Sequence, residues 1–457
     1  MLHDDESIDW TTISPPPLDV LMVLHSYMLS PRDFLEDSLR DRRMALRNAG
    51  FPWQYAEAYL TQDDGRYAVH EDDIRAYERA TEDSWVMDDK SSTPLICPGC
   101  DNSIEITWRE LYQGDIEQIE KGNTRMPFET VCKDCQAPIT QTTLCLHKLS
   151  EDLRLLRDEA KPLAGTLLDA SGRMTSKSDD SDPLLATASL AWQDCGVLDH
   201  LKQPNVDIPS VKELMSSSTP SFPLTRMMEV YENNSSPFAI DLVGAVVRQG
   251  TFISKMQDFD WIHSPAPWQH VKSAVGRYLG FFEVMRQHPD KVAVPTFDVD
   301  LIWHTHQLSP KQYYDFSLKY CNNVFIDHDD KIADGALTDS FGWTCKEYAK
   351  ITGLPYDICL CWCCALLGAD ANESMVHRNE KRYLSRVKAM LGRSSANTRL
   401  SHAKKLVSQI QAVKFENDYV EAQNDSDSAS QQSKREYFEH YVWHYPEYAP
   451  SPAIVAA

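Results

Sequence analysis

The sequence is short of basic residues and lacks any long apolar run. Its 457 residues include 45 Lys and Arg against 68 Asp and Glu, which gives a formal net charge of −23. A chain this acidic repels a phosphate backbone, so nucleic-acid binding would need a local basic patch. No stretch approaches the roughly 18 apolar residues of a transmembrane helix, so we expect no membrane span. The acidic start MLHDDE is unlike a secretory or mitochondrial presequence, and we expect a cytoplasmic or nuclear protein.

Several catalytic signatures are also missing. The chain has no P-loop, no GxGxxG and no nucleophile elbow. It has no succession of strands alternating with helices, which argues against a doubly wound sheet. What it does have is 42% hydrophobic and 10% aromatic residues, which is typical of a folded globular protein. At about 150 residues each, two or three domains are expected.

Apolar residues recur at three- and four-residue spacing, which predicts a mainly α-helical protein. The pattern covers residues 19–39, 271–285 and 383–406. By contrast, residues 169–183 and 416–432 are rich in Ser and Asp and have little to bury, as in linkers.

An internal repeat divides the helical pattern. Residues 16–40 align without gaps on residues 295–319, with nine identities where chance gives about one or two. The alignment places His25 on His304 and repeats a Ser-Pro pair. We therefore predict a duplicated helix-break-helix unit whose two copies pack as a pair in one core.

The break in each copy carries signals for the start of a second helix. Ser309 would be the N-cap, Pro310 the first helical residue, and Gln312 the partner in a capping box. Ser30 would do the same in the first copy. Asp298, which stands before an apolar run, would be the N-cap of the preceding helix.

Two CxxC pairs provide the strongest chemical signal. Their four cysteines, spaced like zinc ligands, are Cys97, Cys100, Cys132 and Cys135. Such knuckles suit a tetrahedral, structural Zn²⁺, and alternating residues in 103–108 and 138–142 suggest short strands of a zinc-ribbon-like module. Free core cysteines or a redox pair are the alternatives. Cys145 and His147 lie just outside and could replace one ligand.

A second group of cysteines is less specific. It consists of Cys359, Cys361, Cys363 and Cys364, with Cys345 upstream. Adjacent cysteines cannot all point at one ion. The group is therefore either a second structural zinc site or a set of buried thiols packed against Trp362.

The segment DVDLIWHTH, residues 298–306, is the candidate for a ligand or catalytic site. On a helix, Asp300 and His304 are one turn apart, and His306 points about 200° away from His304. On a strand, His304 and His306 share a face and could join a carboxylate in a 2-His-1-carboxylate metal site. The capping signals favour the helix. A structural role, in which His25 and His304 form hydrogen bonds across the repeat, is the third interpretation.

Residues 295–316, PTFDVDLIWHTHQLSPKQYYDF, resemble the glycine-rich domain-containing protein-like family, whose hallmark is D-x-D-x-x-W-H-x-H-x-L-x-P-x-x-Y. The earlier PPLDVLMVLHSYMLSPRDFLED resembles that family's first motif, and the late cysteine group resembles its Cys-rich motif. The resemblance covers most of residues 15–366. The zinc-ribbon-like insertion and acidic linkers resemble a fungal member.

The resemblance implies no established reaction. Plant relatives are associated with development and stress responses, and fungal relatives often carry a dioxygenase label. This chain has only 17 glycines and no glycine-rich tail, so RNA binding through such a tail does not carry over. Leu24 and Tyr27 replace the Trp and the second His of the fuller motif in the first copy.

These observations predict six segments: a first helical repeat region (1–90), a zinc-ribbon-like insertion (91–148), a helix and flexible linker (149–225), a second repeat with the histidine motif and Cys-rich end (226–366), a charged helical region (367–415), and an acidic linker with an aromatic tail (416–457).

The favoured function is an intracellular, zinc-stabilised interaction or regulatory protein with a protein partner. Its context, from the resemblance, is development, stress or specialised metabolism. The alternative is a metal-dependent enzyme, such as an oxygenase of fungal specialised metabolism, that uses Asp300, His304 and His306. The basic segment 381–405 is a weaker candidate for nucleic-acid binding.

Overall fold

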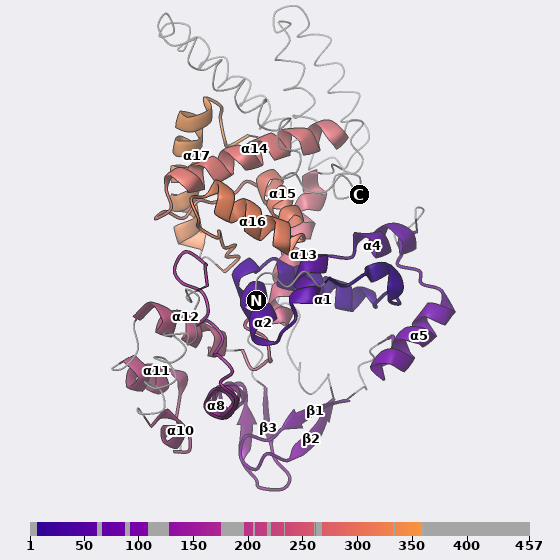
Figure 1. Ribbon diagram of the computed structural model, residues 1–457, viewed down its shortest axis with the longest axis vertical. Helices are drawn as coiled ribbons and strands as arrows, with labels where there is room; N and C mark the ends of the chain where they lie inside the picture. Colours follow the sequence, from indigo (N-terminus) through magenta and orange to yellow (C-terminus); the bar gives the residue numbers. More distant parts are fainter. Residues whose placement is uncertain are drawn as a thin grey trace, which may run out of the picture. The chain divides into compact units, whose positions relative to one another are not determined.

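A computed structural model describes residues 7–61, 66–86, 92–107, 128–174, 196–203, 206–216, 221–232, 234–259, 261, 267–331, 334–358 and 360. These residues are mostly helical with a few short strands, which confirms the mainly α class (Figure 1). Within the described part of the chain, every helix is too short or too polar to cross a bilayer.

The elements follow one another in a simple order. The first part contains a short 3-10 helix (Trp10–Thr12), α1 (Leu18–Met28), α2 (Pro31–Arg40), α3 (Met44–Ala49), α4 (Trp53–Tyr59) and α5 (Glu71–Thr81). The middle part contains β1 (Ser92–Ile96), β2 (Ser103–Thr107), β3 (Glu129–Val131), β4 (Pro138–Thr140), α8 (Gln141–Glu159), α10 (Val197–His200), α11 (Ile208–Ser216) and α12 (Ser221–Tyr231). The last part contains α13 (Leu242–Phe259), α14 (Pro267–Gln287), α15 (Phe297–Gln307), α16 (Pro310–Tyr320) and α17 (Asp334–Thr352).

The chain divides into two compact units. Unit 1 holds the described residues up to Phe252 together with His304–Lys331, and unit 2 holds Ile253–Trp303 and the remaining described residues. The divisions fall inside α13 and α15, so each of these helices belongs in part to both units.

Both Ser-Pro breaks have the same backbone geometry. Ser30 has φ −115° and ψ 75°, and Ser309 has φ −116° and ψ 73°, with proline as the next residue in each case. The expected N-cap positions of Ser30 and Ser309, each followed by proline, are confirmed, but the expected capping box is wrong because neither serine side chain bonds to its helix. Each serine N–H instead donates to the carbonyl three residues earlier, on Tyr27 or His306, which ties the serine into the end of the preceding helix.

The predicted N-cap role of Asp298 is also wrong. Helix α15 already begins at Phe297, and the carbonyl of Thr296 accepts the N–H of Asp300 at 2.8 Å. The Asp298 carboxylate is occupied elsewhere: it lies 2.6 Å from Nε of Arg277. The side chain of Asp298, which the sequence pattern assigns to capping, therefore forms a buried ion pair with Arg277 instead.

Two antiparallel hairpins form a small β module in unit 1. Strand β1 pairs with β2, and β3 pairs with β4. Strands β2 and β4 confirm the alternation expected in 103–108 and 138–142. Strand β4 ends at Thr140 because this residue caps α8, where its hydroxyl accepts the N–H of Thr143 at 3.2 Å.

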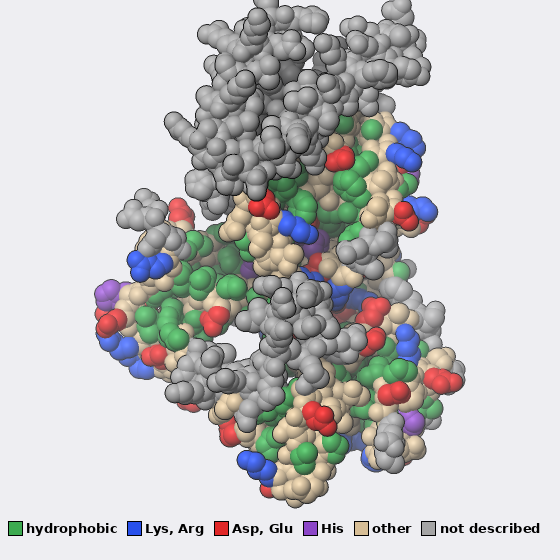
Figure 2. Space-filling model, turned by 180° about the vertical axis from the view of Figure 1, so that it is seen from behind, with side chains coloured by type: hydrophobic (Ala, Val, Ile, Leu, Met, Phe, Trp, Pro, Cys, Tyr) green, Lys and Arg blue, Asp and Glu red, His purple; other side chains and the backbone are tan. Residues whose placement is uncertain are grey.

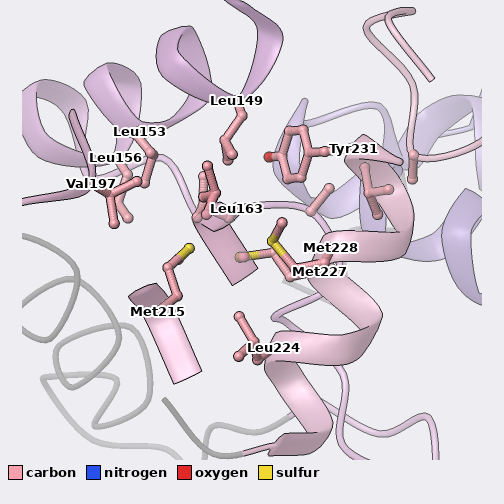
Figure 3. Close-up of a cluster of buried hydrophobic side chains, with 14 residues drawn as sticks. Leu149, Leu153, Leu156, Leu163, Val197, Met215, Leu224, Met227, Met228 and Tyr231 are labelled. Carbon is pink, nitrogen blue, oxygen red and sulfur yellow. The ribbon is translucent and has the colours of Figure 1, made fainter. Parts of the chain in front are cut away.

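Unit 1 has two larger apolar cores. One lies between α8, α11 and α12 and contains Leu149, Leu153, Met215 and Met227 (Figure 3). The other contains Leu29 and Leu308, the residues that stand before the two Ser-Pro breaks. The breaks of both helix pairs thus contribute equivalent leucines to a single core.

A half-buried lysine lies beside the first of these cores, with its ammonium over the ring of Tyr231. Lys148 on α8 donates to the carbonyls of Val230, Asn234 and Phe238 at 3.5, 3.4 and 2.9 Å. Burial lowers the pKa of this ammonium to about 8. The lysine therefore donates to carbonyls in the last turn of α12 and in the segment that follows it.

We expect Lys148→Met to lower the free energy of unfolding by about 1–3 kcal/mol, because it leaves those carbonyls without their donor. Denaturant unfolding followed by circular dichroism measures the change. Lys202→Met is the matched control: its pair with Asp199 is 70% and 84% exposed, and its removal should cost no more than about 0.5 kcal/mol. Equal effects of the two substitutions would contradict the role given to Lys148.

Candidate functional site

The two CxxC segments form knuckles with matching backbones. Cys97 donates its N–H to the carbonyl of Asn102 at 2.9 Å, and Cys132 donates to that of Ala137 at 2.9 Å. The residue after the second cysteine of each knuckle is left-handed, with φ 58° and 61°. Each knuckle is therefore a tight turn that directs two sulfurs to the same side.

The four sulfurs lie around one point. The Sγ atoms of Cys97 and Cys135 are 3.6 Å apart, and those of Cys100 and Cys132 are 3.8 Å apart. All four lie within 4.8 Å of one another. Four thiolates at about 2.3 Å from a tetrahedral ion are separated by about 3.8 Å. The group, which we call the four-cysteine cluster, could therefore hold a metal ion.

Backbone N–H groups favour the thiolate of Cys132 in this cluster, whereas burial raises the pKa of Cys97. Those of Cys135 and Asp134 lower the pKa of the Cys132 thiol to about 7. Gly99 donates its N–H to the sulfur of Cys97 at 3.3 Å. A Cβ at Gly99 would lie 2.7 Å from the Cβ of Ala137, so the close approach of the two knuckles requires glycine there.

The neighbouring candidates lie outside the cluster. Cys145 is buried on α8, and His147 approaches the carboxylate of Asp101 at 4.0 Å. Among the residues that the structure describes, neither belongs to a group with metal-binding geometry, and nor does Cys345. Cys359, Cys361, Cys363 and Cys364 lie outside the described residues, as do segments 381–405 and 416–457.

The histidine motif forms a helix, as the capping signals indicated. Asp300 and His304 lie one turn apart on α15. Nε2 of His304 is 3.2 Å from Nε2 of His328, and ligand atoms of Asp300, His304 and His328 all lie within 4.8 Å of one another. The structure thus brings two of the expected residues together with a histidine that the sequence did not single out.

His306 is not part of this group. It is 2% exposed and packs against the rings of Tyr313 and Phe316, with centroids 5.2 and 5.0 Å away. Burial lowers its pKa to about 3. The α-helical period places His306 on the side of α15 opposite His304. That side packs against aromatic residues rather than lining a ligand site.

His25 of the first helix pair lies close to its aligned partner. Its pKa is lowered to about 4 by burial and, in second place, by the charge of His304. The His25 ring also makes an edge contact with Phe51 at 5.9 Å. The two histidines that the repeat aligns are thus close enough for the charge of His304 to act on His25. The hydrogen bond between them that the structural interpretation expects stays a prediction.

Comparison with known proteins confirms the resemblance to the family, while a fungal origin stays a prediction. Residues 209–315 match the family described as Glycine-rich domain-containing protein-like. Glycine-rich domain-containing protein 1 of Arabidopsis thaliana is 35% identical over 124 residues, which is 25% of this chain and 14% of that protein. Glycine-rich domain-containing protein 2 of the same plant is 31% identical over 134 residues, 25% of this chain and 15% of that protein. No solved structure matches the chain.

The matched region includes only part of the candidate sites. Asp300, His304 and His306 lie within residues 209–315, whereas His328 and the four-cysteine cluster lie outside them. The chain spans only 14% and 15% of the length of these two relatives.

Proposed function

We propose that this protein is a zinc-stabilised interaction or regulatory protein without catalytic activity of its own. The observation that carries the proposal is the geometry of the four-cysteine cluster, whose sulfurs are 3.6 and 3.8 Å apart across the two knuckles. Four thiolates select zinc among the common divalent ions and leave no coordination position for a substrate. The ion would therefore hold β1–β4 together as a zinc-ribbon-like module.

The surface of this module supports a protein partner. Ile96 and Val131 each stand directly before the first cysteine of a knuckle, and they are 43% and 50% exposed. Hydrophobic side chains are visible where β1–β4 lie, at the bottom of Figure 2. Acidic residues outnumber the one lysine in the described part of the module, which favours a protein over a nucleic acid.

The wider setting follows from the same features. Free thiols at the cluster fit a reducing compartment, the cytoplasm or the nucleus. The equal backbone angles at Ser30 and Ser309 support a duplicated helix-break-helix core. By family resemblance, we place the protein in development, stress responses or specialised metabolism. An enzyme that uses Asp300, His304 and His306 as one site is less well supported, because His306 lies in the aromatic core.

The first test is the metal content of the purified full-length chain. Cys97→Ser/Cys132→Ser should lose one equivalent of zinc relative to the wild-type chain, measured by plasma mass spectrometry. Cys145→Ser removes a buried cysteine next to the cluster and should keep the wild-type content. Unchanged zinc in the double variant would overturn the zinc assignment.

The second test changes the exposed apolar residues Ile96 and Val131 on the surface of the module. Proteins cross-linked to the wild-type chain in cells and identified by mass spectrometry should be lost from Ile96→Lys/Val131→Lys, and the zinc content should not change. Val292→Lys, at a residue 53% exposed and outside the module, is the control. A set of cross-linked partners that is the same in both variants would overturn the interaction role of the module.

A further inference from the structure

We propose that His304 and His328, with Asp300 as the third ligand, bind a divalent first-row transition-metal ion at a site distinct from the four-cysteine cluster. Two imidazoles and one carboxylate suit zinc, iron(II) or cobalt(II). Three protein ligands leave coordination positions open, in contrast to the closed set of four thiolates.

The spacing of the two imidazoles is the first argument. Their Nε2 atoms are 3.2 Å apart. If each nitrogen lies about 2.0–2.1 Å from a shared ion, this separation corresponds to an N–metal–N angle of about 100°. That angle lies between the octahedral and tetrahedral values, so an ion fits between the rings without moving either one.

The orientation of His328 is the second argument. Its Nδ1 lies 3.0 Å from the carbonyl oxygen of Leu29. A carbonyl only accepts, so Nδ1 carries the proton, and in a neutral ring the Nε2 lone pair faces His304. A histidine that ligates a metal is commonly held by such a bond from its other nitrogen. Here the carbonyl comes from the residue that precedes the first Ser-Pro break.

The third argument is the placement of the carboxylate. Asp300 precedes His304 by one turn of the same helix, and its ligand atom lies within 4.8 Å of both imidazole nitrogens. Ligand atoms around one ion are about 3–3.5 Å apart, so a small rotation of the Asp300 side chain completes the set. His304 is 4% exposed, and the ring of Phe252 lies 4.6 Å from it, whereas Asp300 and His328 are half-buried, so the site is shielded from water on the side of His304.

The test uses the full-length chain with Cys97→Ser/Cys132→Ser, so that the four-cysteine cluster does not contribute. Cobalt(II) is titrated and binding is followed by calorimetry and visible absorption. We expect a site that loses affinity at least about 10-fold when His304→Gln or His328→Gln is added. His200→Gln, at a half-buried histidine near Ser210, should leave the affinity within two-fold. Equal cobalt affinity in all variants would overturn the proposal. The contact between His304 and His328 would then be only a hydrogen bond between two imidazoles.

A second measurement needs no substitution in the site. Cobalt(II) bound to the Cys97→Ser/Cys132→Ser chain should shift two exchangeable imidazole N–H protons in the proton NMR spectrum, one from each histidine. Absence of such signals at saturating cobalt would also overturn the proposal. Because the cysteine variants lack the cluster, failure here is independent of failure of the proposed structural zinc.

Discussion

If the four-cysteine cluster holds zinc as proposed, removal of the metal is expected to unfold β1–β4 and to leave the core around α8 and α12 folded. The apolar core of the module is too small to support it alone: its buried members are Cys97, Ile106, Phe128, Cys132, Ile139 and Leu144. Two of these, Cys97 and Cys132, belong to the four-cysteine cluster itself. Isolated two-stranded hairpins are marginal in water, and structural zinc supplies about 10–16 kcal/mol of apparent binding free energy. This is the largest effect that we expect from any single change.

Amide hydrogen exchange measures this effect. The N–H groups of Cys97 and Cys132, which close the knuckles, should lose their protection when a chelator is added, and equally in Cys132→Ser. Amides in the middle of α8, near Leu149 and Leu153, should keep theirs because they belong to the other core. In Cys145→Ser without chelator, the same amides should be as protected from exchange as they are in the wild-type chain. Protected knuckle amides after complete metal removal would show that the module folds without the ion.

Local patterns carried most of what the sequence predicted correctly. Each CxxC knuckle is a contiguous turn, so its spacing alone brings two sulfurs together. The helical period separates His306 from His304, and the structure places His306 against Tyr313 and Phe316 as that period requires. Helix α15 itself was expected from the capping signals around it, although Asp298 proved not to cap it.

His328 could not be found in the same way. It follows α16 in the loop IDHDD, 24 residues after His304, with no periodic relation to the motif. The repeat gives no signal either, because its alignment ends at residue 319, before His328. Its place depends on long-range contacts, such as the hydrogen bond to the carbonyl of Leu29, which only the folded chain creates.

Burial of charge was equally hidden from the sequence. Glu36 and Asp37 look like residues of a solvated helix face, yet they are 0% and 2% exposed. Glu36 pairs with Arg226 at 2.9 Å, and Asp37 accepts the N–H of Ala239 at 2.7 Å. These partners lie about 190 to 200 positions away in the chain, and no local pattern anticipates them.

Replacing Arg277 will destabilise unit 2 strongly, and more than replacing Arg286 on the same helix will. Its guanidinium is 7% exposed and lies 2.6 Å from the Asp298 carboxylate. It also donates to the hydroxyl of Thr296 at 3.0 Å and to the carbonyl of Tyr356 at 2.7 Å. One side chain thus joins α14 to the start of α15 and to the segment after α17.

We expect Arg277→Met to lower the free energy of unfolding by about 3–5 kcal/mol, because the substitution leaves the charge of Asp298 buried without its partner. Arg286→Met on the same helix is the matched control: its pair with Glu283 is partly exposed, at 36% and 14%. Removal of that pair should cost at most about 1 kcal/mol. Thermal and denaturant unfolding of the full-length chain measure both.

A double variant separates the loss of the pair from the stranded charge. Arg277→Met/Asp298→Asn removes both charges, so it should recover part of the stability that Arg277→Met loses. Recovery identifies the unpaired carboxylate as the main cost. The comparison also needs the single variant Asp298→Asn. If the double variant loses as much free energy of unfolding as Arg277→Met and Asp298→Asn lose together, the hydrogen bonds to Thr296 and Tyr356 stabilise the unit and the ion pair is secondary.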